Sequence, residues 1–141
     1  MPLKINLKKG QKIILNGAVL ENSNAKNVSF SLLNEVAILR DSEILSPEDT
    51  STPAARVYYC LQCAYLFPHE LEKHLKQFHV FLTDFEQAVP SSKELIETIR
   101  GDVQEEKYYS ALKECRQLIS YESEVLGNVR KPEPTTVSES S

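Results

Sequence analysis

Hydrophobic residues follow two different periods along the chain, and the change falls near residue 52. Before it, apolar residues stand in short runs or alternate with polar ones, which is typical of β-strands. After it, they recur at steps of three and four, the period of an amphipathic α-helix. The pattern predicts an α+β protein in which a small antiparallel β half precedes a helical half.

The β half contains a strong hairpin signal. Asn16-Gly17 separates the apolar runs Ile13–Leu15 and Ala18–Leu20. Asn-Gly favours a two-residue type I′ turn, because both central residues of that turn need positive φ. We expect further strands at residues 3–7, 28–32 and 36–39, with a short edge strand at 44–45. Such brief, sequentially joined strands indicate a small antiparallel sheet or a barrel-like lobe.

Residues 52–67 predict a central helix that joins the two halves. Thr52 suits the N-cap and Pro53 the first helical position, where the missing N–H of proline removes no hydrogen bond. Beyond Arg56 the segment is apolar on nearly every side. A helix of that kind is usually buried between other elements.

Three more helices are predicted after Pro68. The first should end before Pro90. Ser91 and Glu94 form a candidate capping box for the second, which we expect to stop at Gly101. The third presents one stripe made of positions 108, 112, 115 and 119. The end of the chain is rich in Ser, Thr and Pro and is predicted to be a disordered tail.

Composition limits the class and location of the protein. Its 141 residues, 41% of them hydrophobic, are enough for one domain with a real core. No run of about 18 apolar residues predicts a membrane span. The N-terminus lacks the apolar segment of a signal peptide, and three cysteines fit a reducing compartment. These features predict a cytoplasmic protein without a membrane partner.

Charge is divided unevenly between the two halves. Residues 1–40 carry a net charge of +4 and the remainder −8. Four lysines flank the first predicted turn, at positions 4, 8, 9 and 12, off the apolar face of the first strand. Such a basic rim can contact phosphates, although two amphipathic surfaces can also simply differ in sign. Phe30 is the only aromatic residue in this half and alternation places it in the core, so we expect no base-stacking platform.

Cysteine and histidine spacing raises the question of a zinc site. Cys60-x2-Cys63 precedes His74-x4-His79, a pattern similar to the ligand pairs of a zinc finger. Only ten residues separate the two pairs, and the cysteines lie in a helical apolar pattern, whereas a finger places them on a β-hairpin. We therefore expect packed thiols and no metal or other cofactor. Cys115 lies on an apolar stripe and no Gly-rich phosphate loop exists, so we expect binding and not catalysis.

Seven short motifs run in order across residues 3–127. They are Leu7-Lys8-Lys9-Gly10, Ile14-Leu15-Asn16-Gly17-Ala18-Val19, Ala37-Ile38-Leu39-Arg40, Pro47-Glu48-Asp49, Thr52-Pro53-Ala54 with Arg56 and Tyr58, Tyr108-Tyr109-x-Ala111-Leu112-Lys113, and Tyr121-Glu122-x3-Leu126-Gly127. Together they resemble the flagellar biosynthesis repressor FlbT family of alphaproteobacteria. The chain departs from that family in having Ala55 before Arg56, where the family typically has two arginines.

The resemblance implies a post-transcriptional regulator of flagellin synthesis. Members of the family look like regulators that associate with the 5′ untranslated region of flagellin mRNA and lower its translation or promote its decay. They are also linked to the flagellin regulator FlaF. Nothing in the resemblance identifies the residues that contact RNA.

These observations lead to one fold and two functional hypotheses. We expect an antiparallel β lobe at residues 1–50, about four helices packed on it at 51–127, and a tail at 128–141. The first hypothesis is an mRNA 5′-leader binder that represses flagellin expression. Its candidate RNA-binding side chains are Lys4, Lys8, Lys9, Lys12, Arg40 and Arg56. The alternative is an adaptor or chaperone for flagellin or FlaF, which the acidic helical half and the missing aromatic platform favour.

Overall fold

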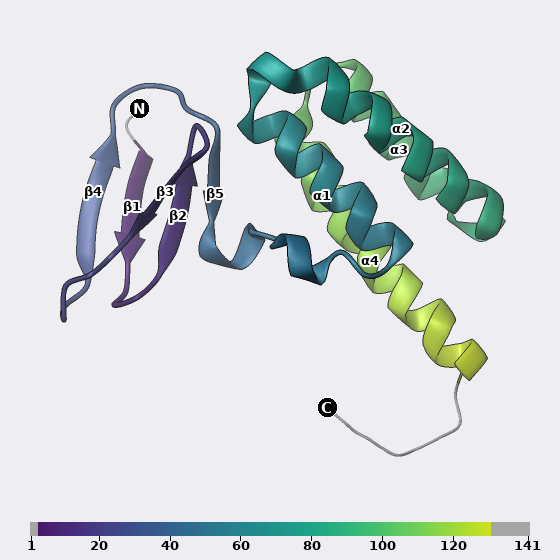
Figure 1. The fold of residues 1–141 in the computed structure, drawn as a ribbon, viewed down its shortest axis with the longest axis horizontal. Helices are drawn as coiled ribbons and strands as arrows, with labels where there is room; N and C mark the ends of the chain where they lie inside the picture. The colour runs from purple at the N-terminus through teal and green to yellow at the C-terminus, as the bar shows by residue number, and fades with distance from the viewer. Residues whose placement is uncertain (1–2, 131–141) are drawn as a thin grey trace.

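The computed structural model describes residues 3–130, and it shows five strands followed by four α-helices in that range. The strands are β1 (Leu3–Leu7), β2 (Lys12–Leu15), β3 (Ala18–Glu21), β4 (Val28–Leu32) and β5 (Ile38–Arg40). The helices are α1 (Pro53–Leu66), α2 (Leu71–Ala88), α3 (Lys93–Gln104) and α4 (Tyr108–Arg130). Figure 1 shows the strands at the left and the helices at the right. The α+β class is confirmed. Helix α4 includes residues 128–130 of the predicted tail, and the remainder of that tail, from 131 onward, lies outside the described residues.

The strands, here named the β lobe (residues 3–40), form two antiparallel sheets that do not close into a barrel. One sheet pairs β1 with β4, and the other has the order β3-β2-β5. Asn16 and Gly17 have φ angles of 51° and 85°. The predicted Asn-Gly hairpin between β2 and β3 is therefore confirmed.

Strand β2 lies in the middle layer of the molecule. Successive residues of a strand point to opposite faces of its sheet. Ile13 packs with Ile5 and Leu7 in a small core between the two sheets. Its neighbour Ile14 packs with Leu39 in the large core that the helices build. Strand β2 is thus covered on one side by β1 and β4 and on the other by the helices, while β3 stays exposed.

Helix α1 is the central helix that the sequence predicts. Its cap forms as expected, with the Ala55 N–H donating to Thr52 Oγ1 at 3.2 Å. Ten of its 14 residues are buried, because α1 packs against both α2 and α4 while α3 covers α4. No helix within residues 3–130 has the length and apolar character needed to cross a membrane.

One stripe of α1 joins the helices to the β lobe through polar side-chain ends. Tyr58, Gln62 and Tyr65 are spaced four and three residues apart, so they lie along one face. The Tyr58 hydroxyl donates to the carbonyl of Glu43 at 2.6 Å. The Tyr65 hydroxyl accepts from the N–H of Ile38, at the start of β5, at 3.0 Å.

The predicted edge strand at Ile44-Leu45 is wrong. The side-chain amide of Gln62 bonds both the N–H and the carbonyl of Leu45, each at 2.9 Å. One side chain thus takes the place of a neighbouring strand. Both apolar side chains instead pack against the helical core.

Two expectations for α3 are also wrong. The Ser91 side chain makes no helix cap and bonds the Tyr121 hydroxyl of α4 instead, so the capping box with Glu94 does not form. Gly101 lies inside the helix and does not end it. The chain leaves the helical conformation at Glu106, whose φ of 62° is left-handed.

Candidate functional site

The turn between β1 and β2 presents two adjacent lysines. Lys8 and Lys9 lead into Gly10, whose φ of 78° needs a residue that tolerates the left-handed region. The Lys8 N–H donates to Gln11 Oε1 at 2.9 Å, and the Gln11 N–H returns to the Lys8 carbonyl at 3.0 Å. The backbone is therefore fixed while both lysine side chains are exposed.

Asn22 brings a third lysine to this turn. Its side chain is buried, and Nδ2 donates to the carbonyls of Leu7 and Lys26, each at 3.0 Å. Its Oδ1 accepts from the Asn24 N–H at 2.9 Å. Because one amide nitrogen holds the residue before Lys8 and also Lys26, the 22–27 loop lies against the β1–β2 turn. The sequence analysis missed Lys26, since nothing in a polar loop shows which Asn will be buried.

The outer face of the sheet β1–β4 adjoins this turn. It carries Lys4 and Asn6 from β1, paired with Ser31 and Ser29 of β4. Asn6 also accepts a hydrogen bond from the Ser29 hydroxyl. Neither strand contains an acidic residue, so this face is polar with a positive charge. Lys4 and Lys8 are four residues apart, or about 13 Å along an extended strand.

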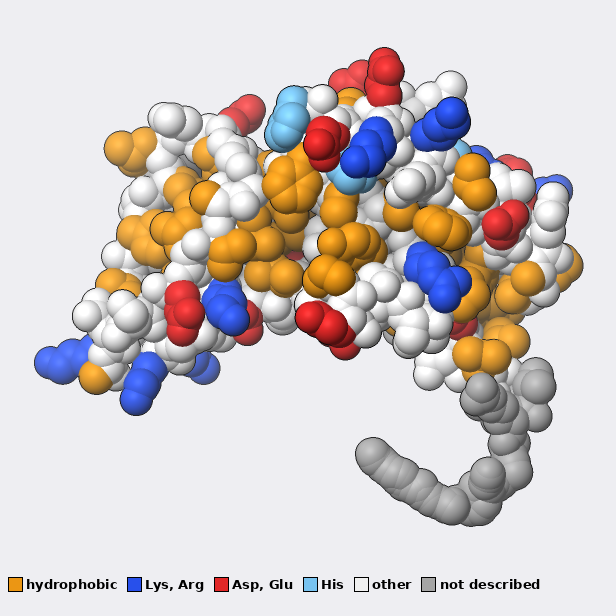
Figure 2. All heavy atoms as spheres, viewed as in Figure 1, with side chains coloured by type: hydrophobic (Ala, Val, Ile, Leu, Met, Phe, Trp, Pro, Cys, Tyr) orange, Lys and Arg blue, Asp and Glu red, His pale blue; other side chains and the backbone are white. Residues whose placement is uncertain are grey.

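The basic side chains gather at one end of the β lobe. The set named here the lysine end consists of Lys8, Lys9, Lys12 and Lys26. Figure 2 shows basic side chains gathered at the lower left, where Figure 1 places the β1–β2 turn. Lys12 is the member of this set that has acidic residues beside it, because it pairs across strands with Glu21 and its main-chain N–H donates to Asp41 Oδ1 at 3.2 Å.

The two predicted arginines lie elsewhere. Arg40 ends β5, and its N–H donates to Glu43 Oε1 at 2.8 Å, so a carboxylate lies against its main chain. Arg56 is on α1 in the helical half, where it lines a pocket together with Asp84 and Glu122. The structure therefore groups Lys8, Lys9 and Lys12, places Lys4 on the adjoining sheet face, and separates both arginines from them.

The pocket that contains Arg56 lies between α1, α2 and α4 and has a volume of about 410 Å³. Its walls are mostly apolar: Pro53, Phe81, Phe85, Ala88, Val89, Val125 and Leu126. Glu122 is buried beside it and accepts a hydrogen bond from the Ala54 N–H at 3.0 Å, at the start of α1. An apolar groove between helices can receive an apolar segment of another protein.

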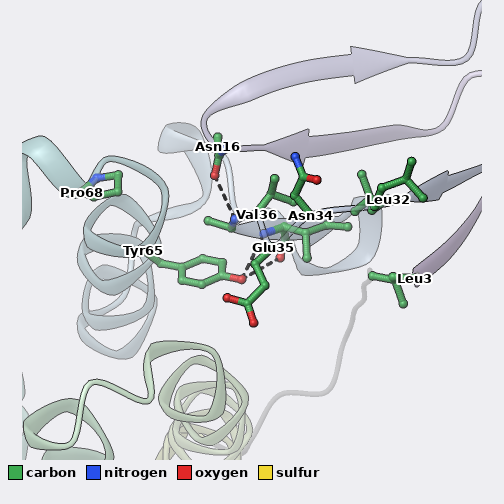
Figure 3. Close-up of a pocket in the computed structure, with 11 residues that line it drawn as sticks. Leu3, Asn16, Leu32, Asn34, Glu35, Val36, Tyr65 and Pro68 are labelled. Atoms are coloured by element: carbon green, nitrogen blue, oxygen red, sulfur yellow. Dashed lines mark hydrogen bonds between the residues drawn. The ribbon is translucent and has the colours of Figure 1, made fainter. Parts of the chain in front are cut away.

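A second, larger hollow of about 720 Å³ lies between the β lobe and the end of α1 (Figure 3). Tyr65 points across it to the main chain of Ile38, and Asn16 Oδ1 accepts from the Ala37 N–H at 2.9 Å. Both polar side chains are therefore engaged in holding β5. Glu35 is the only ionisable carboxyl in the lining, so the hollow does not assemble an acid–base pair.

Cys60 and Cys63 lie in α1, which confirms their predicted helical setting. Burial raises the pKa of Cys60 to about 11 and also raises the pKa of Cys63. The pKa of the buried Cys115 is raised for the same reason. Between residues 3 and 130, no three His, Cys, Asp or Glu side chains lie close enough to hold a metal ion.

Comparison with known proteins gives a consistent result. The family model described as "Flagellar protein FlbT" matches residues 3–126. The chain is 37% identical over 131 residues to the flagellum biosynthesis repressor protein FlbT of Caulobacter vibrioides (strain ATCC 19089 / CIP 103742 / CB 15), covering 92% of each chain. It is 35% identical over 134 residues to the probable flagellum biosynthesis repressor protein FlbT 1 of Bradyrhizobium diazoefficiens, covering 95% of this chain and 91% of the relative. No solved structure matches the chain.

Proposed function

This chain belongs to the FlbT family of flagellar proteins, and from that membership we propose that it represses flagellin production by binding flagellin mRNA. The family match confirms the resemblance drawn from the sequence motifs. The relatives are named flagellum biosynthesis repressors. We propose that this chain associates with the 5′ untranslated region of the flagellin message and lowers its translation or promotes its decay.

The observation that carries the proposal is the lysine end beside an acid-free sheet face. Lys8, Lys9 and Lys26 come from two segments that Asn22 holds together. A lysine ammonium binds phosphate as a point charge, and each such contact releases a condensed counterion. These three lysines of the lysine end, held close together by the fold, are therefore suited to binding the phosphates of an RNA backbone.

The mode of binding follows from what the β lobe lacks. Phe30 packs with the small core between the sheets and is not available for stacking on bases. The outer face instead offers the polar side chains of Asn6, Ser29 and Ser31 next to Lys4. These groups can hydrogen-bond base edges and 2′-hydroxyls of unpaired RNA. We propose that the lysine end binds phosphates and that this polar face contributes hydrogen bonds.

The test is a charge reversal at the turn. We expect Lys8→Glu with Lys9→Glu to weaken binding to a flagellin leader RNA by about tenfold or more, and to flatten the salt dependence by about one to two contacts. Fluorescence anisotropy with labelled leader RNA at several salt concentrations measures both quantities. Melting should stay near that of the unaltered protein, because exposed surface substitutions usually cost little stability.

A matched control separates local charge from overall charge. Lys73 and Lys76 are exposed on α2, so the pair Lys73→Glu with Lys76→Glu changes the net charge equally but in the helical half. We expect this control to keep RNA affinity within about threefold, because screened charges act mainly over about 10 Å. Equal losses in the two double variants, or binding that survives the turn reversal, would contradict the assignment.

The second candidate function is an adaptor or chaperone for flagellin or FlaF, with indirect RNA association. The apolar pocket between α1, α2 and α4 favours it, since Leu126 at its rim is 39% exposed. Amphipathic helices bind grooves of this kind. Titration calorimetry with flagellin and FlaF separately distinguishes the two functions. Protein that binds either partner, loses that binding on Phe81→Asp and binds no leader RNA would replace the first proposal with the second.

A further inference from the structure

Strand β3 lies at an edge of its sheet and is exposed along its whole length. It pairs with β2 on one side only, and all four residues from Ala18 to Glu21 are exposed. Edge strands present unpaired main-chain groups, and proteins usually protect them with charged residues, Pro, bulges or a covering segment. Glu21 is the only charged residue of β3, and it lies at the end of the strand.

The side chains of β3 have the pattern of a central strand. Val19 pairs with Ile14 of β2, and Leu20 pairs with Ile13, so the two large apolar residues of β3 point to opposite faces. Both isoleucines are buried, whereas Val19 is 62% exposed and Leu20 is 41% exposed. Strands that are apolar on both faces are normally covered on both faces.

The opposite edge of the same sheet is blocked. On β5, the N–H of Ile38 donates to the Tyr65 hydroxyl and the N–H of Arg40 donates to Glu43 Oε1. Both main-chain donors that point away from β2 therefore have side-chain partners. The structure thus closes the β5 edge with a helix residue and a carboxylate, and leaves the apolar β3 edge open.

The hairpin geometry shows which groups of β3 are free. Leu15 and Ala18 pair directly beside the two-residue turn, so they form a hydrogen-bonded pair. Hydrogen-bonded pairs alternate along an antiparallel ladder. Ala18 and Leu20 therefore bond to β2, while Val19 and Glu21 direct their N–H and carbonyl groups toward the open edge.

We propose that two copies of this chain associate through β3, antiparallel, to form one continuous six-stranded sheet. The register that pairs Val19 with Glu21 of the second copy satisfies every outward group of these two residues in both chains. It places Leu20 opposite its own symmetry mate and brings no like charges opposite each other. Glu21 keeps Lys12 of its own chain as a neighbour on the other side.

The occupant is a second copy because the edge complements itself in that register. Leu20 meets Leu20 at the two-fold axis, which extends the core between the sheets, and Val19 lies beside Glu21 of the second copy on the opposite face. A pair of four-residue strands buries less than the roughly 1,200–2,000 Å² of a standard interface, so we expect a dissociation constant above about 1 μM. The dimer should therefore form and dissociate with concentration.

Sedimentation velocity on the full chain tests the proposal, with a matched pair of variants. We expect the unaltered protein to shift toward twice its chain mass of 16.0 kDa as its concentration rises. Leu20→Lys should weaken the dimer at least about tenfold, because two like charges then lie directly opposite each other at the two-fold axis. Val80→Lys introduces the same charge at a valine of α2 that is 54% exposed, and it should leave the dimer unchanged.

A disulfide tests the register directly. Cα atoms of a non-hydrogen-bonded antiparallel pair lie about 4.5 Å apart, which suits a disulfide. Leu20→Cys should therefore form a covalent dimer under mild oxidation, whereas Val80→Cys should not. A monomer at all concentrations, or a dimer that Leu20→Lys leaves intact, would overturn the proposal. Protection of the Val19 and Glu21 amides only when flagellin or FlaF is added would assign the edge to another protein's strand and would also overturn it.

Discussion

Replacing Asn22 by alanine should both destabilise the protein and weaken its binding to RNA. The Asn22 side chain makes three hydrogen bonds of 2.9–3.0 Å, to the carbonyls of Leu7 and Lys26 and to the N–H of Asn24. Alanine cannot replace any of them. The main-chain bonds of residue 22 to Gly10 and Gln11 are retained in the variant, so the loss is limited to the amide.

The expected destabilisation follows from the number and burial of these bonds. A hydrogen bond within a protein contributes about 0.5–1.5 kcal/mol net, and a buried group left without a partner costs more. Asn22 is only 5% exposed, so water does not fully replace the lost bonds. We expect a loss of about 2–3 kcal/mol, which lowers the melting temperature by roughly 6–12 °C for a chain of this size.

Asn24→Ala provides the control. Asn24 is exposed, and only its main-chain N–H takes part in the Asn22 network, so the alanine variant keeps that bond. Urea unfolding should separate the two variants by about 2 kcal/mol. RNA binding, measured well below the melting temperature of each, should fall about threefold or more for Asn22→Ala only, because Lys26 is no longer held beside Lys8.

Two results would refute this reasoning. If Asn22→Ala has the same melting temperature as Asn24→Ala, the side-chain amide of Asn22 does not hold the 22–27 loop. If Asn22→Ala is destabilised as expected but binds leader RNA with unchanged affinity and salt dependence, Lys26 is not part of the RNA site. The first result concerns the structure and the second the function, so the two measurements remain separate.

Gly17→Ala should lower the free energy of unfolding, measured in urea, by about 1 kcal/mol more than Gly10→Ala does. Both glycines have positive φ, but only at Gly17 would a Cβ meet the Phe67 ring, at 3.0 Å. Equal losses in the two variants would contradict this contact. Glu114→Gln should stabilise the protein at high pH and flatten its pH dependence. Burial, together with the Asp102 carboxyl, raises the pKa of Glu114 from 4.5 to about 7, so the folded state keeps a proton that the unfolded state loses and stability falls as pH rises between these values. Unfolding in urea at about pH 5 and about pH 8 measures this slope, and an unchanged slope in the variant would show that another group causes it.

Local signals in the sequence predicted the elements whose cause is local. Asn16-Gly17 forms its hairpin because the turn needs two positive φ angles, and both are found. Thr52 and Pro53 begin α1 because a side-chain cap and a missing N–H suit that position. The helical setting of Cys60 followed from the apolar pattern around it.

Features that depend on distant partners were not predictable in this way. The apolar side chain of Leu45 suggested a strand, but its main-chain N–H and carbonyl are bonded by the side chain of Gln62, 17 residues away. Glycine often ends a helix, but inside one it costs only about 1 kcal/mol relative to alanine. The buried residues on either side of Gly101 therefore keep α3 helical to Gln104. In the candidate site, Lys26 lies beside the β1–β2 turn only because the buried Asn22 bonds its carbonyl. Arg56 lies on α1, in the helical half and away from that turn.

The adjacent isoleucines of β2 link the two hydrophobic cores thermodynamically. Ile13 belongs to the small core and Ile14 to the large one, so separating either layer exposes a side chain whose burial is worth about 1.5–3 kcal/mol. Neither core can melt while the other keeps its full stability, and unfolding should be a single cooperative transition. A ligand of the helices alone therefore also raises the melting temperature of the β lobe. RNA bound to the β lobe and a protein bound to the helices would therefore both stabilise the same folded state, without any contact between the two ligands.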